Sequence, residues 1–244
     1  MPLKYQLYND ICNYSGRWTV SYKITDNHIQ LYPHFLFRDY SVFTKDNFNQ
    51  YLWYFLKRAF DLVISVIALI TGFPFFTFLV IMTKITSGGS VFYRQERIGR
   101  NGVPFRMYKL RSMYVNAENA GPQLSKDNDP RVTAWGKIMR KSRLDELPQF
   151  LNVFLGQMSV VGPRPERLFF IEQIIEKAPE YKKLLTIKPG ITSIGQVRYG
   201  YAENVHQMIE RMELDLLYLD HQRLSVDMGI IAETVRVMAQ GKGK

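Results

Sequence analysis

The sequence predicts an α+β fold, mainly α, that combines a re-entrant membrane helix, a basic β-hairpin and a compact helical domain with interfacial helices. Three observations lead to this class: a long uncharged run at 62–83, two β-rich runs around an Asn-Gly turn, and helical periodicity through most of the later chain. We divide the chain into an N-terminal extension (1–53), the membrane helix (54–84) and a cytoplasmic domain (85–244).

The composition narrows the classes of partner. The chain has 244 residues, enough for one sizeable domain with additions, and its 32 Lys+Arg against 22 Asp+Glu give a net charge of +10. Nucleic acid, anionic lipid and phosphorylated substrates all suit such a charge. The single cysteine, Cys12, excludes an internal disulfide and is compatible with a reducing cytosol.

The N-terminal extension contains a predicted hairpin whose role the sequence does not indicate. Apolar side chains alternate with polar ones from Trp18 to Ile24 and again from Ile29 to Leu31. The Asp26-Asn27 pair between them is a turn signal.

The uncharged run from Leu62 to Thr83 is long enough to cross a membrane. About 22 residues rising about 1.5 Å each match a hydrocarbon core of about 30 Å. Gly72-Phe73-Pro74 interrupts the run near its middle, and an interior proline kinks a helix because it lacks an N–H. Basic residues flank both ends, and the positive-inside rule places both flanks in the cytoplasm. A helix–break–helix that enters one leaflet and returns satisfies both observations; a kinked spanning helix and a buried soluble-core helix are the alternatives.

A strongly basic hairpin follows. Two β-rich runs, 91–98 and 105–111, flank an Asn101-Gly102 turn, which is a strong hairpin signal. Its cations are Arg94, Arg97, Arg100, Arg106, Lys109 and Arg111. The default interpretation of such a run is a charged surface exposed to solvent. The functional interpretation is a surface that binds phosphate groups.

Two adjacent carboxylates, Asp145 and Glu146, lie in a cation-rich stretch. The apolar side chains around and after them recur at helical spacing: Leu147, Phe150, Leu151 and Phe154. Because Pro148 is tolerated only in a first turn, the helix is expected to begin between Ser142 and Asp145. The free N–H groups and dipole of a helix start favour anions. The pair is therefore either a solvated helix cap or a functional acid pair.

The remaining chain predicts further helices around a rigid phosphate-binding turn. Pro163 and Pro165 restrict the backbone around Arg164, which suits bidentate recognition of phosphate. The expected elements are helices at 131–141, 166–177 (Pro165 in the first position), 203–218 and 227–240, a turn at 188–192 and a short strand at 195–198. The last helix is apolar over most of its circumference, so it suits the core or the membrane surface.

Several motifs match one family together. They are Lys57-Arg58 with Asp61, the apolar run with its central Pro74, Phe92, Gln95, Arg97-Ile98-Gly99, Lys109-Leu110-Arg111-Ser112-Met113, Leu144-Asp145-Glu146-Leu147-Pro148-Gln149, Val161-Gly162-Pro163-Arg164-Pro165 and Lys188-Pro189-Gly190-Ile191-Thr192. From about Tyr54 onward, in this order and spacing, the chain resembles the bacterial sugar transferases, the monotopic phosphoglycosyl transferases. The resemblance implies transfer of a sugar-1-phosphate from a UDP-sugar to undecaprenyl phosphate with release of UMP. That is the first membrane step of capsule, exopolysaccharide, O-antigen or glycoprotein glycan assembly.

The resemblance also implies roles for individual residues. Asp145 matches the family nucleophile, which carries the sugar phosphate covalently, and Glu146 matches its partner acid; together they hold Mg²⁺. Cations expected around the diphosphate and the lipid phosphate are Lys109, Arg111, Arg140 and Arg164. Arg198, in a segment that contacts nucleotide or sugar, and the C-terminal acid Asp227 complete the expected binding residues. Pro74 matches the break of the re-entrant helix.

The implied partners are a UDP-sugar, undecaprenyl phosphate, inner-membrane lipids and downstream glycosyltransferases, and nucleic acid is not among them. The implied location is monotopic, on the cytoplasmic face of a bacterial inner membrane. Two segments depart from the family pattern: His221-Gln222-Arg223 replaces a common Asn-Trp-Ser, and 194–201 replaces Leu-Ala-Gln-Val-Asn-Gly-Arg-Asn. These departures bear on the substrate rather than the reaction. Larger members add membrane helices and a further soluble domain, so the chain resembles the catalytic module with a short extension.

Two other functions compete with transfer. A nucleic-acid-binding protein explains the charge but leaves the apolar run and the paired acids without a role. A non-catalytic membrane scaffold explains the anchor and the basic surface, and predicts that Asp145→Asn changes nothing. Chemistry favours transfer, because a carboxylate that attacks phosphorus splits one displacement into two easier steps. Cations and a metal allow that carboxylate to approach a diphosphate.

Overall fold

The computed structural model describes residues 21–25, 28–32, 45–118, 121–126 and 129–241. The chain divides into two compact units, Met1–Leu56 and Lys57–Lys244, which are described separately. In the first unit, β1 (Ser21–Thr25) pairs antiparallel with β2 (His28–Tyr32), so the predicted hairpin is confirmed over its described part. Trp18, Val20 and the Asp26-Asn27 turn lie outside the described residues.

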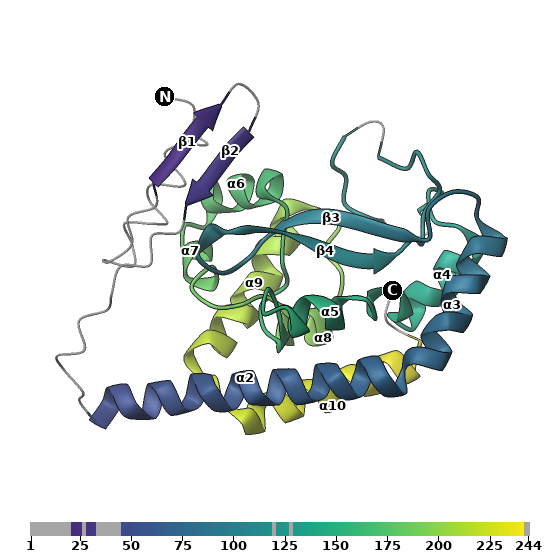
Figure 1. Cartoon of the computed structure of the whole chain (residues 1–244). Helices are drawn as coiled ribbons and strands as arrows, with labels where there is room; N and C mark the ends of the chain where they lie inside the picture. The colour runs from purple at the N-terminus through teal and green to yellow at the C-terminus, as the bar shows by residue number, and fades with distance from the viewer. Residues whose placement is uncertain (1–20, 26–27, 33–44, 119–120, 127–128, 242–244) are drawn as a thin grey trace. The chain divides into compact units, whose positions relative to one another are not determined.

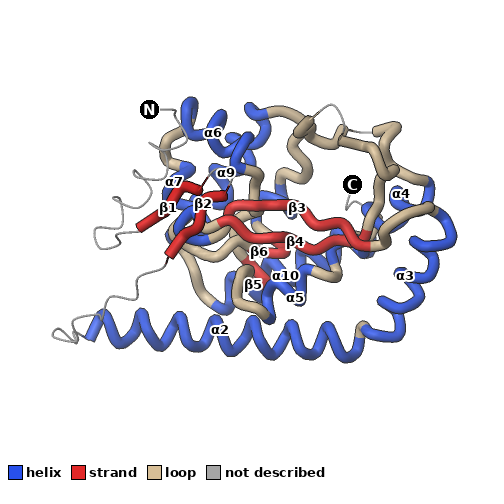
Figure 2. Tube along the Cα trace, turned by 45° about the horizontal axis from the view of Figure 1, so that its top comes forward, coloured by secondary structure: helices blue, strands red, loops and turns tan. Residues whose placement is uncertain are grey.

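The apolar run forms two helices, α2 (Lys45–Thr71) and α3 (Phe73–Thr86), and α3 leaves α2 in a new direction (Figures 1 and 2). Pro74 lies in the first turn of α3, where its missing N–H costs least. A Cβ atom at Gly72 would collide with the carbonyl oxygen of Ala68, so the break itself requires glycine. The interruption falls where Pro74 predicts it.

Most of this helical segment is exposed. Residues Tyr51–Thr86 are long and apolar enough to cross a membrane, and only 11% of the most apolar window is buried. Ile70, Phe73 and Ile85 have 68%, 66% and 74% of their surface exposed. This exposure argues against the buried core helix of a soluble protein and indicates association with a membrane.

The basic hairpin is confirmed. β3 (Phe92–Ile98) pairs antiparallel with β4 (Pro104–Leu110), with Phe92 opposite Leu110 and Ile98 opposite Pro104. Asn101 and Gly102 have φ of 59° and 74°, the left-handed conformation that a tight hairpin needs. A second pair was not predicted: β5 (Ser159–Val161) runs parallel to β6 (Gly190–Thr192), in the segment expected to be a turn.

Two apolar cores lie along β4. In the first, Phe105 and Met107 pack with Val153, Val161 and Tyr218. Phe60 and Ile64 of α2 pack against this cluster. In the second, Leu110 packs with Leu79 of α3 and Met139. Each half of the broken membrane segment is therefore attached to a different part of one hairpin.

A buried polar cluster holds α2 to the rest of the second unit. The Lys57 ammonium lies 2.7 Å from the Asp227 carboxylate and 3.5 Å from that of Asp61. Asp61 accepts hydrogen bonds at 3.0 Å from the Ser159 hydroxyl and the Val160 N–H. Because buried carboxylates need such partners, the cluster fixes α2 against β5 and the C-terminal helix.

The predicted helix across the acid pair is wrong in its start, and only part of its predicted apolar face is covered: Leu147 and Phe150 pack against the cores, whereas Leu151 and Phe154 do not. α4 (Ala134–Lys141) ends first, a 3₁₀ turn spans Leu144–Glu146, and α5 (Gln149–Phe154) follows. Arg143 interrupts the helix with φ of 53°. Leu151 and Phe154 are 40% and 45% exposed, whereas Gln149, Asn152 and Val153 are buried. The orientation of α5 is set by polar contacts. The Asn152 side chain accepts a hydrogen bond from the Tyr108 N–H and donates one to the Arg106 carbonyl, so it docks α5 on β4.

The C-terminal half is helical, as expected, with shifted boundaries. Its helices are α6 (Leu168–Lys177), α7 (Tyr181–Leu184), α8 (Ile194–Arg198), α9 (Val205–Asp220) and α10 (Leu224–Ala239). The strand expected at 195–198 is wrong. Ser193 accepts a hydrogen bond from the Gln196 N–H and so caps a helix there. Pro165 does not open α6, because Arg167 is still extended and the Glu166 carbonyl accepts from the Ile98 N–H.

Candidate active site

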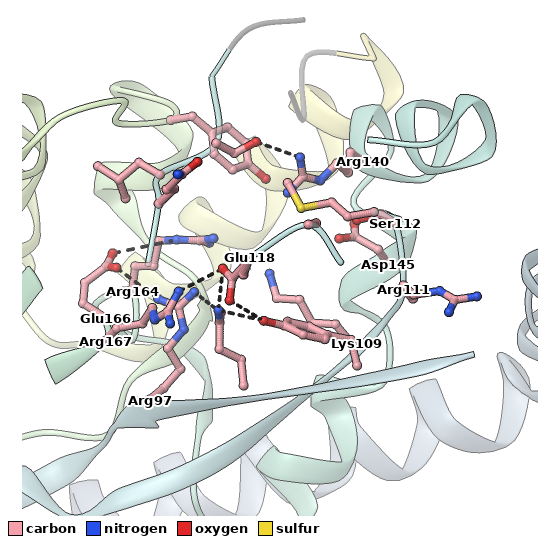
Figure 3. Close-up of a pocket in the computed structure, with 18 of the residues that line it drawn as sticks. Arg97, Lys109, Arg111, Ser112, Glu118, Arg140, Asp145, Arg164, Glu166 and Arg167 are labelled. Carbon is pink, nitrogen blue, oxygen red and sulfur yellow. Dashed lines mark hydrogen bonds and ion pairs between the residues drawn. The ribbon is translucent and has the colours of Figure 1, made fainter. Parts of the chain in front are cut away.

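A cationic pocket opens between the hairpin, the 3₁₀ turn and the segment before α6 (Figure 3). Its lining includes seven cationic side chains: Arg97, Lys109, Arg111, Arg140, Arg164, Arg167 and Arg211. It includes three acids: Glu118, Asp145 and Glu166. Because the cations outnumber the acids, the pocket favours an anionic ligand, and guanidinium groups suit phosphate.

Asp145 lines this pocket, and Glu146 follows it in the 3₁₀ turn. Asp145 and Glu146 are only 5% and 4% exposed. The Lys109 ammonium lies 2.7 Å from Oε1 of Glu146, and Nη1 of Arg164 lies 3.6 Å from the same oxygen. Oε2 of Glu146 is buried and has no hydrogen-bond partner among the described residues. The interpretation as a solvated helix cap is therefore wrong, since both acids are buried among cations.

The surroundings shift the pKa values of the two acids in opposite directions. Burial raises the pKa of Asp145, and the Glu146 charge adds to that effect against the opposing influence of Lys109. Burial acts in the same direction on Glu146, but Lys109, Arg164 and Arg143 outweigh it and lower the pKa of that carboxyl well below its usual range. Glu146 is thus the permanently charged member, and Asp145 is the one whose charge depends on its surroundings.

One carboxylate, Glu166, organises the guanidinium groups at the opposite side of the pocket. It lies 3.2 Å from Nη1 of Arg97, 2.5 Å from Nη2 of Arg211 and 3.9 Å from Nε of Arg164. Burial lowers the pKa of Arg97 to about 10, with Glu166 acting in the opposite direction, so this cation remains charged at neutral pH. Arg167 is held separately, 2.9 Å from Glu118.

The structure brings together most of the residues expected to bind substrate. Lys109, Arg140, Arg164 and Asp145 all line the pocket. Arg111 lines it too, but its guanidinium points away from Asp145 (Figure 3) and donates to the Ser87 carbonyl at 2.7 Å. Nη1 of Arg140 donates to the Ser125 hydroxyl at 2.8 Å.

Two expected binding residues lie elsewhere. The Arg198 side chain is 59% exposed and pairs with Glu233 at 3.2 Å. Asp227 is fully buried, bonded to the Tyr218 hydroxyl at 2.7 Å and paired with Lys57. Neither lines the cationic pocket. Asp227 instead attaches α2 to α9 and α10.

Sequence reasoning missed several residues of the pocket. Arg97, Glu166, Arg167, Arg211 and Tyr201 line it. The sequence places Arg97 in the basic hairpin and in a family motif but does not predict a binding role for it, and the short spacing between Arg164 and Arg167 is the other available signal. Nothing in the local sequence marks Arg211, because its partner Glu166 lies 45 residues away.

A second pocket, almost wholly apolar, lies at the break between α2 and α3. Its lining residues are Ala68, Leu69, Gly72, Phe73, Phe76, Phe92, Arg94, Tyr108, Leu147, Pro148, Phe150 and Leu151. Among the described residues that line it, Arg94 is the only charged one, and its guanidinium lies over the Tyr108 ring at 5.5 Å. Leu147 and Pro148 directly follow the acid pair, so this apolar groove adjoins the catalytic candidates.

Among the described residues, no cluster of three or more His, Cys, Asp or Glu side chains has the arrangement of a metal site. The acid pair remains as a two-carboxylate candidate. Mg²⁺ is commonly bound by one or two carboxylates together with substrate phosphates and water. The unpartnered Oε2 of Glu146 is an acceptor suited to such an ion.

Comparisons with known proteins relate this chain to one family. The family model described as bacterial sugar transferase matches residues 52–241. The chain is 38% identical over 192 residues to the UDP-N-acetylgalactosamine-undecaprenyl-phosphate N-acetylgalactosaminephosphotransferase of Aeromonas hydrophila, covering 79% of this chain and 45% of that protein. It is 40% identical over 181 residues to the UDP-glucose:undecaprenyl-phosphate glucose-1-phosphate transferase of Klebsiella pneumoniae, covering 73% and 39%.

A shorter relative is matched over almost its whole length. The exopolysaccharide production protein PSS of Rhizobium leguminosarum bv. phaseoli is 37% identical over 198 residues, covering 77% of this chain and 98% of that protein. The chain therefore spans less than half of the first two relatives but nearly all of this one. The match includes the membrane segment, the hairpin, the acid pair and the final helices. The chain belongs to the bacterial sugar transferase family.

Proposed function

We propose that this protein transfers a sugar-1-phosphate from a UDP-sugar to undecaprenyl phosphate and releases UMP. The reaction would open the assembly of an exopolysaccharide, capsule, O-antigen or glycoprotein glycan at the cytoplasmic face of a bacterial inner membrane. The observation that carries the proposal is Asp145, which lines a cationic pocket while Lys109 and Arg164 hold its neighbour Glu146. The names of the relatives from Aeromonas and Klebsiella support the donor and acceptor classes.

The proposed chemistry has two displacements at one phosphorus. A carboxylate oxygen of Asp145 forms a bond to the β-phosphorus of the UDP-sugar, and the bond from that phosphorus to the bridging oxygen breaks, so UMP leaves with the electron pair. A phosphate oxygen of the lipid then attacks the same phosphorus and releases the Asp145 carboxylate. Lys109 and Arg164 would stabilise the charge on the transferred phosphoryl group.

Asp145 and Glu146 are the residues that would hold Mg²⁺. The fit rests on the unpartnered Oε2 of Glu146 and on the low pKa of that carboxyl, which keeps it ionised as a metal ligand. When bound, the ion would neutralise charge on the diphosphate.

The membrane segment suits the lipid acceptor. We place α2 and α3 as a re-entrant pair that enters and leaves the cytoplasmic leaflet, because the break at Gly72 and Pro74 coincides with a change of direction (Figure 1). The apolar groove at this break would receive the isoprenoid chain next to its phosphate. Arg94, the charged side chain of the groove, complements a lipid phosphate.

A panel of UDP-sugars tests the function directly. Purified protein in detergent is mixed with undecaprenyl phosphate, Mg²⁺ and each donor in turn, and UMP release is measured. At least one donor should release UMP, and Asp145→Asn should abolish that release. If no donor yields UMP, or if Asp145→Asn is as active as the natural protein, the assignment fails and a scaffold role is favoured.

A further inference from the structure

Tyr201 lies on the pocket wall, with two guanidinium groups over its ring. Its ring centroid is 5.6 Å from Cζ of Arg143 and 5.6 Å from Cζ of Arg164, both within the range of cation–π attraction. Gly200, with φ of 95°, turns the chain just before it. Arg143 and Arg164 are two of the three cations that lower the pKa of Glu146.

Neither guanidinium is firmly fixed by hydrogen bonds. Arg143 is 6% exposed, yet its Nε and Nη1 have no hydrogen-bond partner among the described residues. Its Nη2 donates to the Gln196 carbonyl at 3.3 Å. The ion pairs of Arg164, to Glu146 at 3.6 Å and to Glu166 at 3.9 Å, are longer than good hydrogen bonds. The ring face is therefore a shared support for both cations.

We propose that Tyr201 is a positioning residue, whose ring face holds Arg143 and Arg164 against Glu146 and so shapes the phosphate-binding side of the site. This inference rests on the proposed function for its place in the reaction, but not for its geometry. The ring would act through its face and not through its hydroxyl. We therefore expect that a phenyl ring can replace the phenol, whereas an aliphatic side chain cannot.

The test uses the affinity of the full-length protein for inorganic pyrophosphate, titrated in detergent. Tyr201→Phe should bind within about twofold of the natural protein, and Tyr201→Leu about fivefold or more weakly. Tyr199→Leu is the matched control, because Tyr199 bonds to Glu210 and does not line the pocket. Melting temperatures check folding, and Tyr201→Met, which is closer in size, replaces the leucine variant if that variant is unfolded.

Three results would overturn the inference: no pyrophosphate binding by the natural protein, equal binding by Tyr201→Leu, or a Tyr201→Phe variant as weak as Tyr201→Leu. Transfer kinetics of the same variants provide the second readout. The value of kcat/KM should fall with Tyr201→Leu and be restored with Tyr201→Phe. If the natural protein releases no UMP from any donor, the proposed function fails, while the pyrophosphate affinities still decide the role of Tyr201.

Discussion

Arg164 reaches the acid pair from between two prolines, and its planar guanidinium faces Glu146, Glu166 and the Tyr201 ring together. A lysine carries the same charge, but its ammonium group lacks the paired N–H donors and the planar shape of a guanidinium. Arg164→Lys should therefore lower the rate of transfer by about tenfold or more, given about 1.5–3 kcal/mol for a hydrogen bond to a charged group.

The matched control for this change is Arg198→Lys, because Arg198 is largely exposed and pairs with Glu233 at the surface. Its effect on steady-state UMP release should stay within about twofold. Near-normal activity of Arg164→Lys would mean that Arg164 only balances charge. A large loss with Arg198→Lys would restore the role in substrate binding that the sequence predicts for Arg198.

The raised pKa of Asp145 gives a pH dependence with a defined sign. Only the ionised carboxylate can attack phosphorus, and burial lowers the ionised fraction at any given pH. The rate of UMP release without lipid should therefore rise with pH and reach half its plateau above the ordinary aspartate value of about 4. Pre-steady-state UMP release across a pH series measures this. A rate that stays flat from about pH 4 upward would contradict the raised pKa of Asp145, and a rate that falls as the pH rises would contradict its assignment as nucleophile.

At the scale of elements, the α2–α3 break predicts a topology with both ends on one side of the membrane. Single cysteines at Lys45 and Asn116 should both resist an impermeant thiol reagent in intact spheroplasts and react after lysis. These experiments use a Cys12→Ser background. Pro74→Leu should straighten the segment and make part of the Lys45→Cys population reactive from outside. Labelling of Lys45→Cys in intact spheroplasts without the proline change would instead favour a spanning helix.

The apolar groove predicts a separation of the two half-reactions. Leu151 lines the groove and is 40% exposed, so Leu151→Glu introduces a charge where an isoprenoid chain would lie. The KM for the polyprenyl phosphate should rise about tenfold or more, while UMP release without lipid changes by less than about twofold.

Leu217→Glu, at a 56% exposed leucine of α9, is the control for a surface charge and should change neither step. Equal loss of both half-reactions with Leu151→Glu would indicate damage to the acid pair. An unchanged KM for the lipid would remove the groove from the acceptor site.

Elements with strong local signals were predictable from sequence, and those that depend on a distant partner were not. Asn101-Gly102 marks the hairpin and Pro74 marks the break, because both act through their own backbone. The left-handed Arg143 carries no such mark, so the helix across the acid pair was placed wrongly. Asn152 docks α5 on β4 and leaves Leu151 and Phe154 exposed, through a contact that apolar spacing does not reveal.

At the scale of the whole molecule, the site is assembled from segments far apart in the chain. The resemblance supplied Lys109, Asp145 and Arg164, which the fold does bring to one pocket. It did not supply the shared carboxylate Glu166, which connects the hairpin to α9. Residue motifs indicate which chemistry to expect, but the arrangement of these cations depends on tertiary pairing that the sequence does not show.

The central claim is that Asp145 carries the sugar phosphate covalently, and a reaction without lipid tests it most directly. Protein mixed with a UDP-sugar and Mg²⁺ alone should release up to about one equivalent of UMP. Mass spectrometry of the digest should find a sugar-phosphate adduct on the peptide that contains Asp145. Asp145→Asn should lose both signals, and Glu146→Gln should slow turnover. UMP that appears only after polyprenyl phosphate is added, with no adduct on that peptide, would contradict the covalent route and leave Asp145 as a metal ligand or general base.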